Sequence, residues 1–319
     1  MKRTFHYQQH RGDLPVRLKQ HVDLDVLRAM HVLQPWKHAL VAAGWICLTA
    51  LCAGLTAQTR WPWLWPVAIL LQGFHLLGFT ILLHEQVHDC IVRGRPRLNA
   101  ALGVLYAAPC AMSPTQFRHW HLDHHNELGS DTLDPKRANL SPRRNARWLK
   151  LAYLTPALFP IYFRGAAREV STYPPEVQAR IGRERRGMIL LHLIILTTLW
   201  AVGGWWLAVR VHLAPLLFGF PVAFVINRLG QHYWIDPDDP AKWSSRVDGN
   251  PLWRWLFLWS NHHIEHHYYP RVPCYNLTRL NRALRPFFEA QGIPNRTYRQ
   301  LLTRWFVDNE QAHTAWREP

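Results

Sequence analysis

Residues 61–88 read WPWLWPVAILLQGFHLLGFTILLHEQVH, an apolar run that ends in two histidines four positions apart. No Asp, Glu, Lys or Arg occurs from Trp61 to Leu83, and about 20 apolar residues are enough for a helix to cross a bilayer. The closing HEQVH matches H-E-x-x-H, in which two histidines on one helix face bind zinc and the glutamate acts as general base. The stretch therefore predicts a membrane helix that presents two imidazoles to a metal.

Three further uncharged runs extend from Ala39 to Thr59, from Met188 to Val209 and from Val211 to Asn227. We expect an all-α membrane protein with four transmembrane helices in two hairpins, the alternative being buried helices of a soluble core. The shorter apolar segments 98–112 and 151–163 favour interfacial or re-entrant helices. The expected spans are 39–58, 61–83, 188–209 and 213–229, within a membrane domain 39–285 that follows a cytoplasmic segment 1–38 and precedes a cytoplasmic tail 286–319.

The formal charge of +16 would usually suggest a nucleic-acid partner, but its distribution indicates a membrane instead. Basic residues crowd the N-terminal segment and the stretches 93–97, 136–150 and 180–186, whereas the links at Arg60 and Arg210 carry one charge each. The positive-inside rule then places the bulky segments in the cytoplasm. Because arginine outnumbers lysine 31 to 6, we expect a bacterial source, hence a multi-pass protein of the inner membrane with a cytoplasmic site and no nucleic-acid partner.

The five cysteines form no C-x-x-C pair, so we expect reduced thiols and no iron–sulfur cluster. The charged and polar N-terminus shows no cleavage-site pattern. We expect the first span to act as an uncleaved signal anchor.

Twenty histidines occur, and half of them fall in three clusters. Within the second and third clusters H-x-x-H-H recurs in register, and residues i, i+3 and i+4 share a helix face. Each of these boxes can therefore aim three imidazoles at one point. Nine histidines outside the clusters are expected to pack or to form ordinary hydrogen bonds: His6, His10, His21, His31, His38, His75, His192, His212 and His313. The clusters are His84 and His88; His119, His121, His124 and His125; His262, His263, His266 and His267.

Metal binding explains this crowding, because it takes the neutral imidazole and compensates its burial. Catalytic zinc uses three protein ligands, and eight or nine imidazoles suit two ions with four or five nitrogens each and an open position. Such ligation fits iron, while copper and manganese stay open by ligand type. Residues expected to support the ligand rings, through their second nitrogens or as flanking groups, are Asp89, Asp123, Glu127, Asp131, Glu265, His119 and His262.

HEQVH, HLDHH and HIEHH, in this order and around two apolar hairpins, resemble the three histidine boxes of the integral-membrane fatty acid desaturase and hydroxylase family. The resemblance covers about residues 40–285 and is nearest in spacing to acyl-lipid or sphingolipid desaturases. NHHIEHHYYPRVPCYNL is similar to the third-box pattern, and GQHYW lies where the family has an additional ligand, His232. The metal ligands that it implies are His84, His88, His121, His124, His125, His232, His263, His266 and His267.

The resemblance implies a cytoplasmic helical cap that holds a di-iron centre, with two Fe ions and with O2 as co-substrate. The implied reaction introduces a double bond into a fatty acyl or related lipid chain. An external electron donor is also implied, a ferredoxin or a cytochrome b5-like protein, for which the basic face offers a docking surface. Three alternatives stay open at this point: a lipid, alkane or carotenoid hydroxylase or ketolase, an intramembrane zinc metalloprotease with Asp248 as third ligand, and a non-catalytic metal-binding or transport protein.

Overall fold

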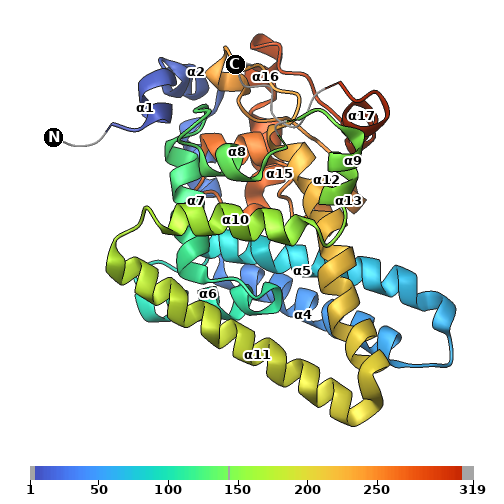
Figure 1. Cartoon of the computed structure of the whole chain (residues 1–319). Helices are drawn as coiled ribbons and strands as arrows, with labels where there is room; N and C mark the ends of the chain where they lie inside the picture. The colour runs from blue at the N-terminus through green and yellow to red at the C-terminus, as the bar shows by residue number, and fades with distance from the viewer. Residues whose placement is uncertain (1–3, 143, 311–319) are drawn as a thin grey trace.

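The computed structural model describes residues 4–142 and 144–310, and in these two ranges every regular element is a helix. Figure 1 shows long helices in the lower part of the molecule and many short helices above them, where both termini also lie. The four main long elements are α4 (Pro35–Ala57), α5 (Trp65–Val87), α11 (Pro175–Ala208) and α12 (Phe220–His232) with the helical segments that lead into it from Val209. The all-α prediction is confirmed for the described residues.

Three helical runs are long and apolar enough to cross a membrane: Pro35–Ala57, Pro62–Val87 and Pro175–His232. The first two agree with the predicted spans 39–58 and 61–83. In the most apolar stretch of the run Pro62–Val87, 67% of the residues are buried. In the corresponding stretch of the run Pro175–His232, only 11% are buried. Helix α5 is therefore the central helix, while α11 exposes its apolar side chains along most of its length.

The third run corrects the predicted link at Arg210. The chain leaves helical geometry at Gly203 and Gly204, where Gly204 has a φ of +76°, and there α11 turns back toward α12 (Figure 1). Glycine adopts this conformation without a Cβ clash. Arg210 instead lies in the helical π segment Val209–Leu213, and its guanidinium donates to the carbonyl oxygens of Thr56 and Ala57 at the end of α4.

Helix α6 (Pro96–Ala107) packs on the long helix α5, and α10 (Leu158–Val170) packs on the short helix α8 (Pro135–Leu140). The first corresponds to the predicted apolar helix 98–112. The predicted helix 151–163 is divided, because the chain turns between Leu154 and Ala157. Single-turn π segments cover Val209–Leu213, Pro215–Gly219 and Thr303–Val307, and 3-10 turns cover Pro62–Leu64, Ala108–Cys110, Pro240–Lys242 and Cys274–Asn276.

The short helices build a cap over one end of the long ones. A separate buried cluster joins the N-terminal helices to the C-terminal ones, with Leu14 and Met30 packed among side chains such as Phe287 and Phe288. The cap helices are α1 (His6–His10), α2 (Leu14–His21), α3 (Leu24–Met30), α7 (Pro114–Asn126), α8 (Pro135–Leu140), α9 (Arg147–Tyr153), α13 (Pro251–Leu256), α14 (His263–Tyr268), α15 (Leu277–Ala283), α16 (Arg285–Ala290) and α17 (Tyr298–Leu302).

Candidate metal centre

Helix α5 carries the first two histidines to the place where it ends. His84 lies in its last turn and His88 is its C-cap residue. Asp89 then takes a positive φ of 55°, which stops the helix and directs the chain toward α6. A largely buried membrane helix thus presents two imidazoles at its tip.

Helix α7 carries the second box, and its start is tied to the long helix α11. Ser113 caps α7 by accepting the backbone N–H of Gln116 at 3.0 Å. The hydroxyls of Ser113 and Thr115 both donate to the Glu184 carboxylate, at 2.6 Å each. These bonds hold α7 in place across the end of α5.

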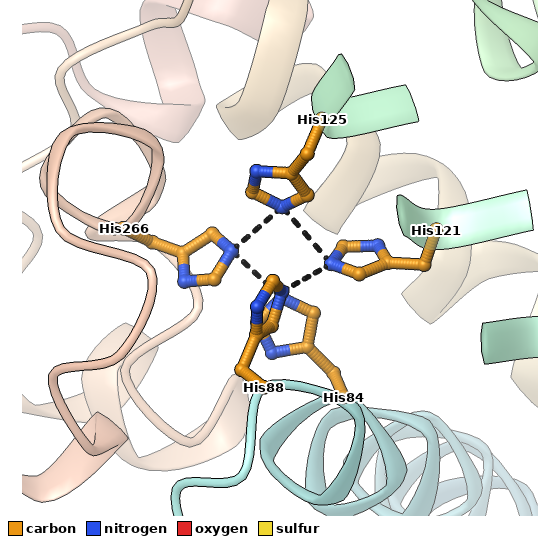
Figure 2. Close-up of side chains that lie close together, drawn as sticks. All are labelled: His84, His88, His121, His125 and His266. Carbon is orange, nitrogen blue, oxygen red and sulfur yellow. Dashed lines mark hydrogen bonds between the residues drawn. The ribbon is translucent and has the colours of Figure 1, made fainter. Parts of the chain in front are cut away.

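Five of the histidines converge in a first group. Their Nε2 atoms lie close together, with 2.7 Å from His88 to His121, 3.0 Å from His121 to His125 and 3.0 Å from His125 to His266. His84 Nε2 completes the set at 3.0 Å from His266 Nε2. Figure 2 shows the five rings from α5, α7 and α14 pointing toward one another. The group comprises His84, His88, His121, His125 and His266.

Four histidines form a second group, which lies next to the first. His232 Nε2 is 3.1 Å from His124 Nε2 and 3.0 Å from His263 Nε2, and His263 Nε2 is 3.1 Å from His267 Nε2. The rings of His125 and His267 stack at 4.4 Å between centroids and so join the two groups. The second group is His124, His232, His263 and His267. All nine histidines predicted as ligands are thus brought together, including His232.

The structure corrects one detail of the box geometry. Each H-x-x-H-H box divides between the groups, so it does not aim three imidazoles at one point. In α7 the i and i+4 residues, His121 and His125, enter the first group, and His124 enters the second. Adjacent helical residues point about 100° apart, so neighbours such as His266 and His267 face different groups.

The ring tautomers in the second group show that it suits a cation. His124 donates its Nδ1–H to the carboxylate of Asp134 at 2.9 Å, and His232 donates its Nδ1–H to the carbonyl oxygen of Trp243 at 2.8 Å. A neutral imidazole has one N–H, so both Nε2 atoms carry lone pairs. These lone pairs face each other at 3.1 Å, an arrangement that repels unless a positive charge lies between them.

The spacing agrees with ligation of an ion. An Nε2 atom can make one hydrogen bond, yet His121, His125 and His266 each approach two neighbouring Nε2 atoms. Nitrogens bound at about 2.1 Å and at right angles lie about 3.0 Å apart. The residues present therefore fit a metal ion in each group, with nitrogen donors only.

Burial keeps these imidazoles neutral, as ligation requires. Desolvation is the largest cause, and neighbouring positive groups such as Lys136 and other histidines add to it. The pKa falls well below 6.5 for the grouped histidines outside the apolar runs, namely His88, His121, His124, His125, His263, His266 and His267.

The carboxylate that holds a ligand ring is Asp134, which the sequence did not single out. Asp134 is 1% exposed and also caps α8 by accepting the backbone N–H groups of Lys136 and Arg137. An Asp-Pro pair is a common helix start, so its sequence signal is that of a cap alone. The second ring nitrogen of His121 has a different neighbour, Lys136 Nζ at 3.3 Å.

The predicted supporting acids have contacts of other kinds. Asp89 accepts from the Asn99 amide at 3.2 Å, Asp123 from the Tyr173 hydroxyl at 3.4 Å, and Glu127 from the backbone N–H of His6 at 3.2 Å. Asp131 is paired with Arg137 at 2.7 Å. Their proposed support of ligand rings stays a prediction.

The flanking histidines lie outside both groups. His119 packs its ring on Tyr173, and His262 Nε2 lies 3.1 Å from the Thr278 hydroxyl. Glu265 accepts from the Asn281 amide at 2.5 Å and lies 3.8 Å from His262. His75 packs against Trp45 and Trp255, as expected for a histidine outside the boxes.

The protease alternative finds no support in this geometry. Asp248, its third ligand, belongs to neither group and lies 3.7 Å from the Arg285 guanidinium. Glu85 is 2% exposed and accepts the backbone N–H of Cys274 at 2.8 Å. Its carboxylate therefore holds the loop before α15, and it lies 3.6 Å from His84 Nδ1.

Comparison with known proteins gives the same family as the histidine boxes. The family model described as fatty acid desaturase matches residues 59–299, a range that contains all nine grouped histidines. The chain is similar to a beta-carotene ketolase of Paracoccus sp. (strain PC1), 27% identical over 77% of this chain and 90% of the relative. It is also similar to the Homo sapiens sphingolipid delta(4)-desaturase/C4-monooxygenase, 23% identical over 76% and 73%, and to the Bradyrhizobium elkanii dihydrorhizobitoxine desaturase, 25% identical over 73% and 71%.

Proposed function

The chain belongs to the fatty acid desaturase family and is a membrane oxidoreductase, and on this premise we propose that it introduces a double bond into a fatty acyl or related lipid chain. Two hydrogens leave adjacent carbons. Together with two electrons and two protons from outside, they convert one O2 to two waters.

The opposed lone pairs of His124 and His232, 3.1 Å apart, are the observation that carries this proposal. They support a metal ion in the second group. In the first group, Nε2 atoms that each approach two other Nε2 atoms support a second metal ion. We assign the five histidines of the first group and the four of the second as the ligands of two iron ions. Four or five nitrogens leave each ion room for an exchangeable ligand.

Two iron ions and O2 would supply the oxidant that an unactivated methylene requires. The residues of the chain provide the surroundings. Asp134 and the Trp243 carbonyl hold the rings of His124 and His232 with their lone pairs toward the ion. The ligands are largely shielded from water, and His124 is fully buried, which protects a strong oxidant from side reactions.

We further propose four transmembrane spans, with the third helical run crossing twice because it reverses at Gly203 and Gly204. The cap, and with it the di-iron centre, lies on the cytoplasmic side, in a bacterial inner membrane. Domain 39–285 then forms the membrane unit, flanked by segments 1–38 and 286–319. The charge pattern supports this orientation, since the link of the first hairpin carries one charge, Arg60, and the turn at Gly203 and Gly204 carries none, whereas basic residues crowd the N-terminal segment and the stretch 136–150.

The electrons come from an external donor in this proposal, a ferredoxin or a cytochrome b5-like protein. The cysteines of the chain support an external source, because neither of the metal-binding groups found in the described residues contains a cysteine, and iron–sulfur clusters are held by cysteine thiolates. A strongly basic chain favours an acidic donor.

A second candidate reaction inserts oxygen into the lipid instead of removing hydrogen. It is favoured by the similarity to a beta-carotene ketolase, of which the chain covers 90%. Hydroxylation or ketolation of a lipid, alkane or carotenoid uses the same ligands, and the placement of the substrate carbon decides between the outcomes.

The test is expression in a host of known lipid profile, with lipidomics and iron quantification on the purified protein. We expect a new lipid two mass units lighter with the wild type and no product with His266→Ala. His10→Ala, which removes an exposed imidazole outside both groups, serves as the matched control and retains product.

A product heavier by oxygen would select the second candidate. Product formation by His266→Ala at the wild-type level, or a wild-type protein that binds no iron, would contradict the di-iron assignment itself.

A further inference from the structure

A pocket of about 770 Å³ opens between the end of α5, helix α6 and the start of α7. Gln86 and Asp89 line it, and they flank the ligand His88 in sequence. Its volume lies in the range of about 300–1,000 Å³ that is usual for small-molecule sites.

The polar wall of this pocket is strongly basic. Five arginines line it, against one carboxylate, Asp89; they are Arg93, Arg95, Arg118, Arg180 and Arg271. Arg180 pairs with Glu184 at 3.0 Å, and Arg118 donates to the carbonyl oxygen of Val87 at 3.1 Å. In the described part of the chain, Arg93, Arg95 and Arg271 make no ion pair, so three guanidinium groups are free to bind an anion.

The opposite wall is apolar and comes from α6, with Pro96, Ala100 and Val104. Val104 is 49% exposed, and its neighbour Leu105 is 51% exposed. The apolar wall therefore continues onto an exposed apolar helix surface. A ligand that fits both walls has an anionic end and a hydrocarbon end.

Asn99 adds a polar group that points to a ligand. Asn99 lines the pocket and is only 8% exposed. Its side-chain oxygen is buried and has no hydrogen-bond partner among the described residues. Its amide nitrogen is occupied by the carbonyl oxygen of Gln86 and by Asp89, at 3.2 Å each. A buried acceptor without a partner is unfavourable, and a hydroxyl or amine of a bound ligand would satisfy it.

We propose that this pocket binds the head group of the lipid substrate, and that the substrate is an anionic lipid whose phosphate-bearing head also offers a hydroxyl or amine donor. This inference rests on the proposed function. The three unpaired arginines hold the phosphate, Asn99 accepts a hydrogen bond from the head group, and the apolar α6 wall contacts the hydrocarbon part of the lipid.

The test measures lipid retention on the purified full chain. Wild type is incubated in detergent with equal amounts of dioleoyl phosphatidylglycerol and dioleoyl phosphatidylcholine, and retained lipid is counted by native mass spectrometry. The pocket variant is Arg93→Gln/Arg95→Gln/Arg271→Gln. The control Arg97→Gln/Arg183→Gln/Arg299→Gln removes the same charge from exposed positions outside the pocket lining.

We expect wild type and the control to favour phosphatidylglycerol about tenfold, which corresponds to about 1.4 kcal/mol, and the pocket variant to lose this preference. Equal retention by the pocket variant and the control overturns the proposal. Displacement of phosphatidylglycerol by an equal concentration of inorganic phosphate would show a site for free anions instead. A pocket variant that keeps phosphatidylglycerol but oxidises a reduced ferredoxin more slowly would show that these arginines dock the donor.

The two proposals fail separately. A wild type that forms product but shows no preference for phosphatidylglycerol overturns the head-group site and leaves the proposed function standing. A wild type that prefers phosphatidylglycerol but holds no iron and forms no product overturns the proposed function and leaves an anionic-lipid site of another purpose.

Discussion

The Nδ1 atom of His124 lies 2.9 Å from Asp134 Oδ1 and 3.0 Å from Asp134 Oδ2, with both side chains buried. The carboxylate holds the ring so that its Nε2 lone pair faces the second histidine group. A partner of this kind orients a ligand and raises its basicity.

Replacing Asp134 by Asn should weaken iron binding about 10–100-fold, because the negative charge on the far side of the ring is lost. The substituted side chain retains an oxygen that can cap α8, so the fold is preserved. Iron affinity is measured by chelator competition on the purified protein. Asp25→Asn, which alters an exposed pair with Arg28, is the matched control; equal affinity of the two variants would contradict the role of Asp134.

The division of the boxes predicts which double variants lose one ion and which impair both. His124→Ala/His267→Ala removes two ligands of the second group only, so about one iron per chain should remain. His124→Ala/His125→Ala removes neighbouring residues of one box but one ligand from each group, and both ions should be weakened. Iron per chain, measured by mass spectrometry of the metal, tests this. One iron retained by His124→Ala/His125→Ala, with both ions weakened in His124→Ala/His267→Ala, would show instead that each box serves a single ion.

Glu85→Gln should retain product formation. The side chain accepts the Cys274 N–H at 2.8 Å, and a glutamine oxygen can accept the same bond. A zinc protease with Glu85 as general base would lose all turnover. The measurement is product per iron in the lipidomics assay, with Glu85→Ala as the variant that also loses the hydrogen bond. An inactive Glu85→Gln protein with full iron content would show that the carboxylate acts in the chemistry.

Gly73→Ala should destabilise the helix bundle. A Cβ at this position would collide with the backbone of Gly219, because α5 and the π segment before α12 approach there without side chains between them. Overpacking of this kind costs about 1–3 kcal/mol. At Gly54 in α4 an added Cβ meets nothing within 4 Å, so Gly54→Ala is the control and should keep or raise the melting temperature. A rise of the same size in both variants, measured by thermal unfolding in detergent, would refute the close contact.

The sequence by itself was sufficient for the class of fold and for the identity of eight of the nine clustered histidines. Both are recorded in local patterns: uncharged runs of bilayer length indicate membrane helices, and an i, i+3, i+4 spacing places imidazoles on one side of a helix. For His232 the residue pattern was insufficient, and the family resemblance singled it out.

Only the tertiary structure decided how the histidines divide between the two groups and which residues hold their rings. Whether His124 joins His121 or His232 depends on where α7, α12 and α14 meet, and consecutive residues on a helix point about 100° apart. Asp134 reaches His124 because the loop after α7 folds back, a non-local contact that no periodicity reports. The reversal at Gly203 and Gly204, with Arg210 bound to the end of α4, likewise depends on two helices meeting in space.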